Sequence, residues 1–196
     1  FRTDRHETFF SVLRDEQVHE KPDRPLLLLS NSSFGADDDY AMLLDALRAY
    51  DKRPKARKLT LVMSGRGPHL QTWKSRFERV LLQHVNVVFM WFSGAHYPLM
   101  VASADYGVCM HNSSSGVDLP IKVLDLLGCG VPVLAYEYSR TIHESVREGK
   151  NGRLFSSAAQ LAELLHEVGA PEYAHAWEFE ERDWRTEWKR NFYRAL

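Results

Sequence analysis

Residues 106–136 read YGVCMHNSSSGVDLPIKVLDLLGCGVPVLAY, and this stretch decides the fold. It begins with the apolar run Tyr106–Met110, which is typical of a strand covered on both faces. A loop of serine, glycine and aspartate, His111–Pro120, comes next, and apolar residues then recur at helical spacing over Ile121–Leu127. Two glycines end that helix, and Val131–Tyr136 is expected to form the next strand. The stretch therefore predicts two parallel strands joined by a helix.

The same alternation extends over the rest of the chain. Strands are expected at Leu26–Ser30, Leu59–Ser64, Val85–Trp91 and Arg153–Phe155. One helix is expected to begin at a cap within Asp37–Asp39 and to end at about Tyr50, and another to run from the Gly65–Pro68 loop to about Leu82. Further helices are expected at Tyr97–Ala104, Ile142–Arg147 and Ala158–Val168. Ser156 or Ser157 is expected to cap the last of them. Alternating strands and helices predict an α/β fold with a doubly wound parallel sheet. In such a sheet the ligand crevice lies outside the carboxyl ends of the strands, so we expect the loops that follow the strands to form the site.

Length, composition and charge exclude several classes of protein. The chain has 196 residues, 44% of them hydrophobic, so it can bury one sizeable core. A net charge of -1 argues against nucleic acid as a partner, since phosphate backbones demand a cationic surplus. The nine histidines lack metal-ligand spacing, and the two cysteines form no disulfide framework. We therefore expect no metal, no cofactor and a reducing compartment.

The first 24 residues differ in character from the rest of the chain. They are polar apart from one amphipathic patch, and the segment 21–25 reads Lys-Pro-Asp-Arg-Pro, so residues 1–24 are expected to be a linker or interdomain segment. Residues 25–196 are then expected to form one domain. No apolar run is long enough to span a membrane, and the first residues do not resemble a signal peptide. Because the chain begins with Phe1, we expect it to be a fragment of a longer protein.

The loop and helix start between residues 111 and 125 contain the residues best suited to a ligand. Small residues let the backbone approach a ligand closely, and free N–H groups at a helix start bind anions. Pro120 suits the first turn of the helix, where its missing donor costs little. Lys122 is placed to reach a phosphate, and Asp125, about one turn later, to accept hydrogen bonds from a sugar diol. The alternative is an ordinary strand–loop–helix connection with Lys122 and Asp125 on a solvated face.

This segment also resembles a known family. The pattern Pro120-x-Lys-x-x-Asp125, followed by Gly128-Cys-Gly-x-Pro-Val133, resembles the donor-site helix of GT-B glycosyltransferases. The longer string from Ala104 to Asp125 is similar to the chitobiosyldiphosphodolichol β-mannosyltransferase family. The likeness covers nearly all of residues 26–196, in order. Its other matches are Ser30 to Leu47, Gly65-Arg-Gly-Pro68, Tyr97-Pro98, His143-Glu144, Asn151-Gly152, and Trp184 with Trp188.

The resemblance implies a fold and a reaction. Residues 25–196 would be the carboxy-terminal, nucleotide-sugar-binding Rossmann-like domain of a GT-B glycosyltransferase, with a carboxy-terminal helix that crosses back to the amino-terminal half. Enzymes of this family transfer mannose from GDP-mannose to dolichyl-diphosphate-chitobiose, with inversion, at the cytosolic face of the endoplasmic reticulum membrane. The catalytic base, acceptor and membrane contact are expected on the amino-terminal half, and other glycosyltransferases of the pathway are expected partners. This chain alone is expected to bind the donor weakly and to transfer nothing.

The resemblance also assigns donor-binding roles to residues of this chain. Asp125 would hold the ribose hydroxyls, and Lys122 would add positive charge beside the diphosphate. The segment that would supply backbone donors to the diphosphate contains Ser113, Ser114, Ser115, Gly116, Asp118 and Leu119. Gly65, Arg66 and Gly67 would line the crevice. Trp91 or Phe92 would lie beside the guanine, and Glu144 would contact a sugar hydroxyl. The alternatives that stay open are Arg66 as a solvated loop residue, Trp91 as a core strand end and Glu144 as a helix cap. We expect His111 to pack, with contact to a phosphate as the alternative.

One loop departs from the wider GT-B pattern. Many such enzymes place an Arg and a Lys after the first strand of this half, whereas Phe34–Asp39 contains three carboxylates and no cation. Carboxylates would repel a diphosphate unless a metal or distance intervened. We expect these acids to begin a helix, with a metal role as the alternative. Lys122, Arg66 and the helix-start N–H groups are then the candidates for neutralising the diphosphate.

Aromatic residues recur at roughly helical spacing in the carboxy-terminal stretch. They are Trp177, Trp184, Trp188 and Phe192, within a strongly charged context. A stripe of aromatic side chains indicates packing more often than a cofactor site. We therefore expect these rings to pack against protein, with membrane contact as the lesser alternative.

Two rival functions stay open. The first is another enzyme of the same fold, such as a hexosyltransferase or an epimerase with a different nucleotide-sugar. The second is a module without catalytic activity that binds a nucleotide-sugar or a protein partner. Competition between guanine and uracil nucleotides distinguishes the first rival, and binding to a protein partner alone distinguishes the second.

Overall fold

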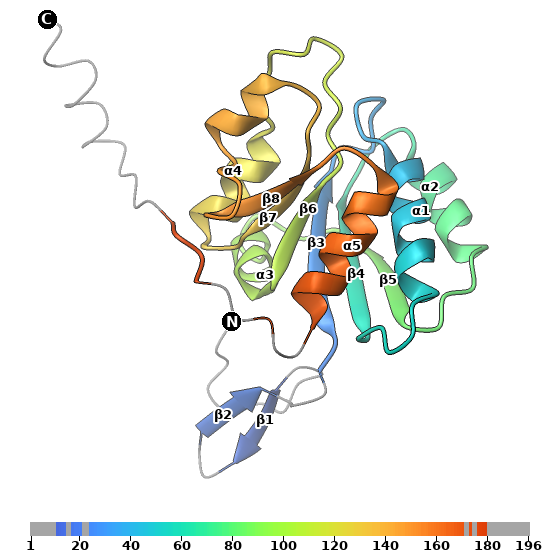
Figure 1. The fold of residues 1–196 in the computed structure, drawn as a ribbon, viewed down its shortest axis with the longest axis vertical. Coiled ribbons are helices and arrows are strands. Elements are labelled where there is room, and N and C mark those ends of the chain that lie inside the picture. Colours follow the sequence, from blue (N-terminus) through green and yellow to red (C-terminus); the bar gives the residue numbers. More distant parts are fainter. Residues whose placement is uncertain (1–10, 15–16, 21–23, 171–172, 174–175, 180–196) are drawn as a thin grey trace, which may run out of the picture.

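The computed structural model describes residues 11–14, 17–20, 24–170, 173 and 176–179, and within them strands and helices alternate (Figure 1). The elements are β1 Ser11–Arg14, β2 Gln17–Glu20, β3 Leu26–Ser32, α1 Tyr40–Asp51, β4 Leu59–Gly65, α2 Leu70–Glu78, β5 Val85–Met90, α3 Tyr97–Ser103, β6 Tyr106–Cys109, α4 Ile121–Gly128, β7 Val133–Tyr136, the 3₁₀ helix η1 Arg140–Glu144, β8 Gly152–Phe155 and α5 Ala158–Gly169. The alternation expected from the sequence is confirmed.

The main sheet has six strands in the order β5-β4-β3-β6-β7-β8. Every neighbouring pair in it is parallel. The chain moves outward from β3 to β5 and then returns to place β6 on the other side of β3. The direction therefore reverses between β3 and β6, and the loops after these two strands diverge there, which opens a crevice at the carboxyl ends. The doubly wound α/β fold is confirmed.

The central strand β3 explains why the sheet is covered on both faces. Leu26 and Leu28 belong to one apolar cluster, while Leu27 and Leu29 belong to the other. Helices α1, α2 and α5 pack on the first face, and α3 and α4 pack on the second (Figure 1). Because successive residues of a strand point to opposite faces, a strand buried between two helical layers needs a continuous apolar run.

Helix α1 begins at the acidic loop, as the sequence predicts. Asp39 is its N-cap, and the side chain of Asp39 accepts a hydrogen bond of 3.0 Å from the backbone N–H of Met42. We expect Asp39→Ala to lower the free energy of unfolding by about 1 kcal/mol, the usual effect of losing such a cap. Asp37→Ala, at an exposed neighbour that is not the cap, should change it by less than about 0.5 kcal/mol. Urea denaturation of the two variants measures the difference, and equal losses would contradict the capping role.

Several expected element bounds differ from the structure, and three of them are worth explaining. Helix α2 ends at Glu78, well before Leu82, because the Asp51 carboxylate accepts hydrogen bonds from the backbone N–H groups of residues 83 and 84 and draws that segment into a loop. Strand β7 begins at Val133 because Pro132 has no N–H for the ladder. The helical turn expected at Ile142–Arg147 is the 3₁₀ helix η1, which begins earlier and is capped by Ser139.

The two ends of the chain are described only in part. Within residues 1–24, β1 and β2 pair antiparallel, from Ser11 opposite Glu20 to Arg14 opposite Gln17, in a small sheet of their own (Figure 1). The sequence did not predict these strands, and the role of the segment as a linker stays a prediction. In the carboxy-terminal stretch, Trp177 packs edge-on against Tyr106 with ring centroids 5.9 Å apart. The other aromatic residues of that stretch, Trp184, Trp188 and Phe192, lie outside the described residues.

Candidate functional site

A cleft of about 270 Å³ lies at the carboxyl ends of the central strands. It is lined by the carboxyl ends of β3 and β4, by the segments that follow β3 and β5, and by helices α3 and α4. Its lining residues are Asn31, Ser32, Ser33, Ser64, Gly65, Trp91, Phe92, Tyr97, Lys122 and Asp125. The cleft adjoins the point where the strand order reverses, which is where the sequence predicts the site.

Helix α4 supplies the two charged side chains of the cleft. Lys122 and Asp125 are three residues apart, so they lie on the same face of the helix. Val123 and Leu126 lie on the adjacent, buried face of the helix and pack in the apolar cluster that covers the sheet. The hypothesis drawn from the sequence required Lys122 and Asp125 to share a crevice, and the structure brings them together there.

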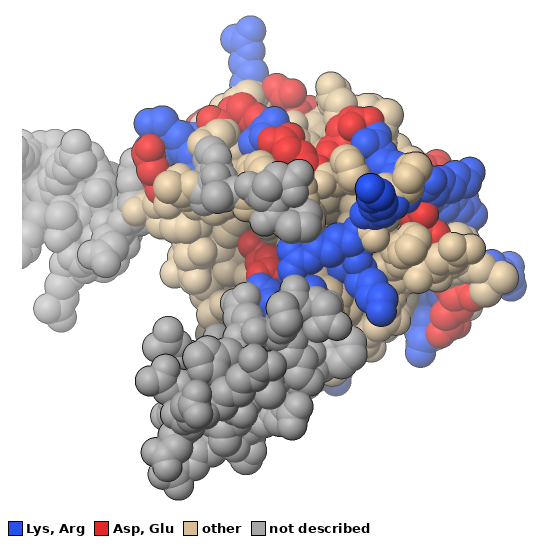
Figure 2. Space-filling view, turned by 60° about the horizontal axis from the view of Figure 1, so that its bottom comes forward, with Lys and Arg blue, Asp and Glu red and all other residues tan. Residues whose placement is uncertain are grey.

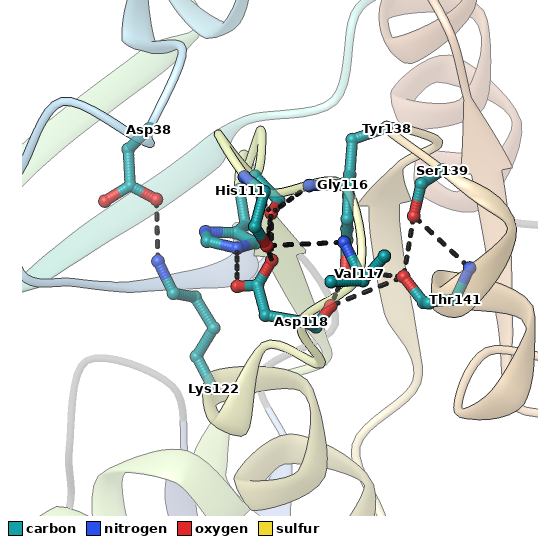
Figure 3. Close-up of polar contacts among 11 residues, drawn as sticks. Asp38, His111, Gly116, Val117, Asp118, Lys122, Tyr138, Ser139 and Thr141 are labelled. Carbon is teal, nitrogen blue, oxygen red and sulfur yellow. Dashed lines mark hydrogen bonds and ion pairs between the residues drawn. The ribbon is translucent and has the colours of Figure 1, made fainter.

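Lys122 is already paired with an acidic side chain. Its Nζ lies 2.6 Å from Oδ1 of Asp38, a carboxylate whose side chain is only 2% exposed (Figure 3). The other carboxylate oxygen of Asp38 accepts a hydrogen bond of 2.9 Å from the hydroxyl of Ser32. The ion pair therefore connects α4 to the loop after β3 and matches the charge of Lys122 in the unliganded state.

This ion pair also explains the acidic loop that lacks a cation. Asp38 neutralises Lys122, and Asp39 caps α1, so two of the three carboxylates serve the fold. The part of the chain that the structure describes contains no group of three acidic, histidine or cysteine side chains that could hold a metal ion. The expectation that these acids begin a helix is confirmed for Asp39.

Asp125 is held by Tyr97, which is in turn held by Asn31, and the sequence did not single out either as a site residue. The hydroxyl of Tyr97, at the start of α3, donates a hydrogen bond of 2.8 Å to Oδ2 of Asp125. The side-chain amide of Asn31, at the end of β3, donates one of 2.7 Å to the same hydroxyl. Three separate elements therefore meet at the carboxylate that is predicted to hold a ribose.

Trp91 lies at the mouth of the cleft with half of its side chain exposed. The alternative that Trp91 is a core strand end is therefore wrong. The guanidinium of Arg66 lies 3.8 Å from the centroid of the indole ring, in cation–π contact. Arg66 is exposed and is not among the residues that line the cleft, but this contact holds its charge next to the opening.

Gly65 and Gly67 permit two loops to touch at the backbone. A Cβ at Gly65 would lie 1.7 Å from the carbonyl oxygen of Ser32, and one at Gly67 would lie 1.6 Å from that of Ser33. Gly65 also has φ +145°, which side chains disfavour. Gly65 lines the cleft, whereas the structure places Gly67 against the neighbouring loop and not on the cleft wall.

The serine-rich loop after β6 satisfies its own backbone. The hydroxyl of Ser113 accepts hydrogen bonds from the N–H groups of Ser115, at 3.2 Å, and Gly116, at 2.9 Å. The hydroxyl of Ser115 accepts another from Val117, at 3.3 Å (Figure 3). Serine hydroxyls commonly compete for nearby backbone groups in this way. Two of the N–H groups that the sequence predicts as diphosphate donors, those of Ser115 and Gly116, are therefore occupied here, and the loop does not line the cleft.

Asp118 holds the same loop in place. Its carboxylate accepts hydrogen bonds from Ser113, Ser115 and, at 2.7 Å, from Nε2 of His111. The hydrogen bonds from Ser113 and His111 lower the pKa of Asp118 to about 2. His111 also packs edge-on against the ring of Tyr138, with centroids 5.3 Å apart (Figure 3). The expectation that His111 packs is confirmed, and Asp118 stabilises the loop.

Two further predicted residues lie away from the cleft. Glu144 is exposed and is the last residue of η1, so the alternative that it caps a helix N-terminus is wrong, since Ser139 has that place. Leu119 is 38% exposed, just before α4. Of the predicted donor-binding residues, the cleft therefore brings together Gly65, Trp91, Phe92, Lys122 and Asp125.

A second cleft, of about 490 Å³, lies at the opposite ends of the strands and includes Arg24, Lys58 and His84. Figure 2, turned so that the bottom of Figure 1 comes forward, shows Lys and Arg side chains gathered in a band with acidic side chains beside them. Arg24 forms a two-pronged ion pair with Asp105, at 2.7 and 2.5 Å. Because ligands of open α/β sheets bind at the carboxyl ends of the strands, the smaller cleft is the candidate site.

Comparison with known proteins settles the family. The model of the family Glycosyl transferases group 1 matches residues 25–169. The chain belongs to this family. The carboxy-terminal domain of a glycosyl transferase group 1 family protein from Francisella tularensis has the same fold, with a TM-score of 0.55 and 17% sequence identity over 74% of each chain. The expected Rossmann-like fold of a glycosyltransferase is confirmed.

Curated relatives support the narrower resemblance. A mouse protein named chitobiosyldiphosphodolichol beta-mannosyltransferase is 40% identical over 146 residues, which are 72% of this chain and 30% of that protein. An Arabidopsis thaliana protein named UDP-glycosyltransferase TURAN is 39% identical over 177 residues, or 82% of this chain and 38% of that protein. The chain therefore spans well under half the length of these relatives. The resemblance to the β-mannosyltransferase family is confirmed.

Proposed function

We propose that this chain is the donor-binding half of an inverting mannosyltransferase, which moves mannose from GDP-mannose to dolichyl-diphosphate-chitobiose in the assembly of N-glycan precursors. One observation carries the proposal: Lys122 and Asp125 lie on one face of α4 and line one cleft where the strand order reverses. A cation at a helix start suits a diphosphate, and a carboxylate suits a ribose diol. The name of the mouse relative supports the substrates.

The diphosphate requires positive charge nearby, and the charge of Lys122 is already paired with Asp38. Lys122 donates one hydrogen bond to Asp38, and an ammonium has three N–H groups, so two can turn toward a phosphate. Arg66 supplies a second cation beside the cleft mouth, on the indole of Trp91. The N–H groups of Ser115 and Gly116 become available only when the Ser113 hydroxyl rotates away from them. Donor binding is therefore expected to reorganise the loop after β6.

The remaining parts of the reaction belong to the part of the enzyme outside this chain. Inverting transfer needs a general base for the acceptor hydroxyl. Asp125 is the only carboxylate among the lining residues of the cleft, and the proposal uses it for the ribose. The base, the acceptor site, the membrane contact and the pathway partners are therefore assigned to the amino-terminal half, at the cytosolic face of the endoplasmic reticulum membrane. No helix within the described residues is both long and apolar enough to cross a bilayer.

A uridine nucleotide is the second candidate donor. The Arabidopsis relative carries the name UDP-glycosyltransferase, and it matches 82% of this chain. The contacts proposed for Lys122, Asp125 and Trp91 involve the diphosphate, the ribose and a stacked base, and all three groups occur in both nucleotides. The nucleobase must therefore be determined by experiment.

Thermal unfolding of the chain with GDP, GDP-mannose and UDP tests the proposal. A ligand that binds only the folded state stabilises it by about 2.7 kcal/mol at a hundred times its dissociation constant. For a chain of this size that corresponds to a rise in Tm of several degrees, roughly 2–4 °C per kcal/mol. We expect GDP and GDP-mannose to raise Tm, and UDP to do so less. A folded sample that binds UDP alone would support the second donor, and one that binds no nucleotide would contradict donor binding altogether.

A further inference from the structure

Asn31, Tyr97 and Asp125 form a chain of hydrogen bonds across the cleft wall. Asn31 ends β3, Tyr97 begins α3 and Asp125 lies in α4, so three elements that are distant in sequence meet at one point. Nδ2 of Asn31 is 2.7 Å from the Tyr97 hydroxyl, which is 2.8 Å from Oδ2 of Asp125. All three residues line the cleft, and none of the roles assigned above requires Asn31 or Tyr97.

The direction of the protons in this chain is determined by its chemistry. A carboxylate can only accept, so the single proton of the Tyr97 hydroxyl points to Asp125. Burial, together with the hydrogen bond to Asp125, raises the pKa of Tyr97, so the hydroxyl keeps this proton. The hydroxyl oxygen must then accept from Asn31, which means that the NH₂ side of the amide faces Tyr97. The amide orientation thus follows from the inventory of donors and acceptors.

This arrangement leaves acceptors without donors. Oδ1 of Asn31 is the one buried side-chain polar atom without a hydrogen-bond partner in the described part of the chain, and Asn31 is 8% exposed. Oδ1 of Asp125 likewise receives no hydrogen bond from the described residues, because Tyr97 uses Oδ2. A buried polar atom without a partner in a native protein requires an explanation, and a ligand that completes it is one. Two adjacent hydroxyls of a sugar ring carry two donors, one for each of these oxygens.

We propose that Tyr97 and Asn31 are positioning residues that orient the carboxylate of Asp125 toward a vicinal diol of the ligand, and that the free oxygen of Asn31 accepts from the same diol. The inference rests on the proposed function, in which that diol is the ribose of the donor nucleotide. It adds Asn31 and Tyr97 as the residues through which Asp125 selects a ligand that carries a diol. A flexible carboxylate would bind a diol and a single donor similarly, whereas a carboxylate with one oxygen already occupied presents the other in a fixed direction.

Binding of GDP and of 2′,3′-dideoxy-GDP, measured by calorimetry, tests the inference. The unsubstituted chain should bind GDP at least about tenfold more tightly than the dideoxy analogue, because a site built for hydroxyls discriminates against a ligand without them. Tyr97→Phe keeps the ring and removes the hydroxyl, and it should weaken GDP binding about fivefold while leaving binding of the dideoxy analogue unchanged. Asn31→Asp replaces the donor to Tyr97 by an acceptor of the same shape, and it should reduce the preference for GDP over the dideoxy analogue.

Tyr50→Phe is the matched control, since its buried hydroxyl donates to the backbone oxygen of Arg57, away from the cleft. It should leave the affinities for both nucleotides unchanged. In a chain that already carries Asp125→Asn, adding Tyr97→Phe should change the affinity for GDP by less than about twofold, because Tyr97 acts through the Asp125 carboxylate. Equal losses for GDP and its dideoxy analogue in both Tyr97→Phe and Asn31→Asp would overturn the inference alone. A folded chain that binds neither nucleotide would instead contradict the proposed function, and with it this inference.

Discussion

Replacing Lys122 by methionine is expected to lower the free energy of unfolding by about 3 kcal/mol, the lower end of the range for breaking a buried ion pair. The effect comes from Asp38, whose side chain is 2% exposed and would lose Lys122, its only cationic partner among the described residues. The lower end applies because the Lys122 side chain is itself 19% exposed. The hydrogen bond from Ser32 remains, but a neutral hydroxyl does not replace a positive charge. Urea denaturation followed by circular dichroism measures the loss.

Two further variants separate this effect from simple loss of a lysine. Lys74→Met removes an exposed partner of Glu78, 3.9 Å away one helical turn along, and should cost less than about 0.5 kcal/mol. Asp38→Asn combined with Lys122→Met removes both charges and should recover most of the lost stability, because no unpaired charge is left buried. A loss in Lys122→Met no greater than in Lys74→Met would show that the pair is solvated.

The double variant also separates stability from ligand binding. If it folds like the unsubstituted chain but binds GDP more weakly, Lys122 contributes to the site through its charge and not only by anchoring α4. The pair thus explains how an acidic loop can lie beside a site for an anion. Asp38 holds the lysine in place before the ligand arrives, and the ligand then competes for the remaining N–H groups of that lysine.

The fold was predictable because its signals are local. The run Leu26–Leu29 is apolar at every position, and only a strand covered on both faces requires that. The N-cap at Asp39 and the glycines at the end of α4 mark helix ends through backbone chemistry that neighbours in sequence provide. The strands β1 and β2 were missed because each has only four residues and no clear alternation of apolar and polar side chains.

The position of the site could be predicted from the sequence, whereas the hydrogen-bond partners of its side chains could not. Parallel strands place their following loops at one edge, so the location follows from topology. The partner of each polar atom depends on residues far apart in sequence, such as Asn31 and Tyr97, which are 66 positions apart. No local pattern shows that the Ser113 hydroxyl occupies the N–H groups of its own loop. Polar residues at strand ends were the available signal for Asn31, Ser32 and Ser64, and the sequence argument used it only for the loop after β6.

Asp125→Ala is expected to weaken GDP binding by roughly 10- to 100-fold. A hydrogen bond to a charged group is worth about 1.5–3 kcal/mol, and each 1.4 kcal/mol corresponds to about a tenfold change in affinity. Stability should change little, because Asp125 is partly exposed and its carboxylate forms no ion pair among the described residues. Calorimetry with GDP measures the affinity, and thermal unfolding without ligand checks the fold.

Glu144→Ala is the informative comparison, since the sequence argument placed Glu144 in the donor site and the structure places it outside the cleft. It should alter GDP affinity by less than about twofold, the level expected for a surface change without a ligand contact. If Asp125→Ala bound GDP as tightly as the unsubstituted chain, the ribose would have to be held elsewhere. Helix α4 would then contribute only Lys122 to the ligand, and the argument from the shared face of Lys122 and Asp125 would fail.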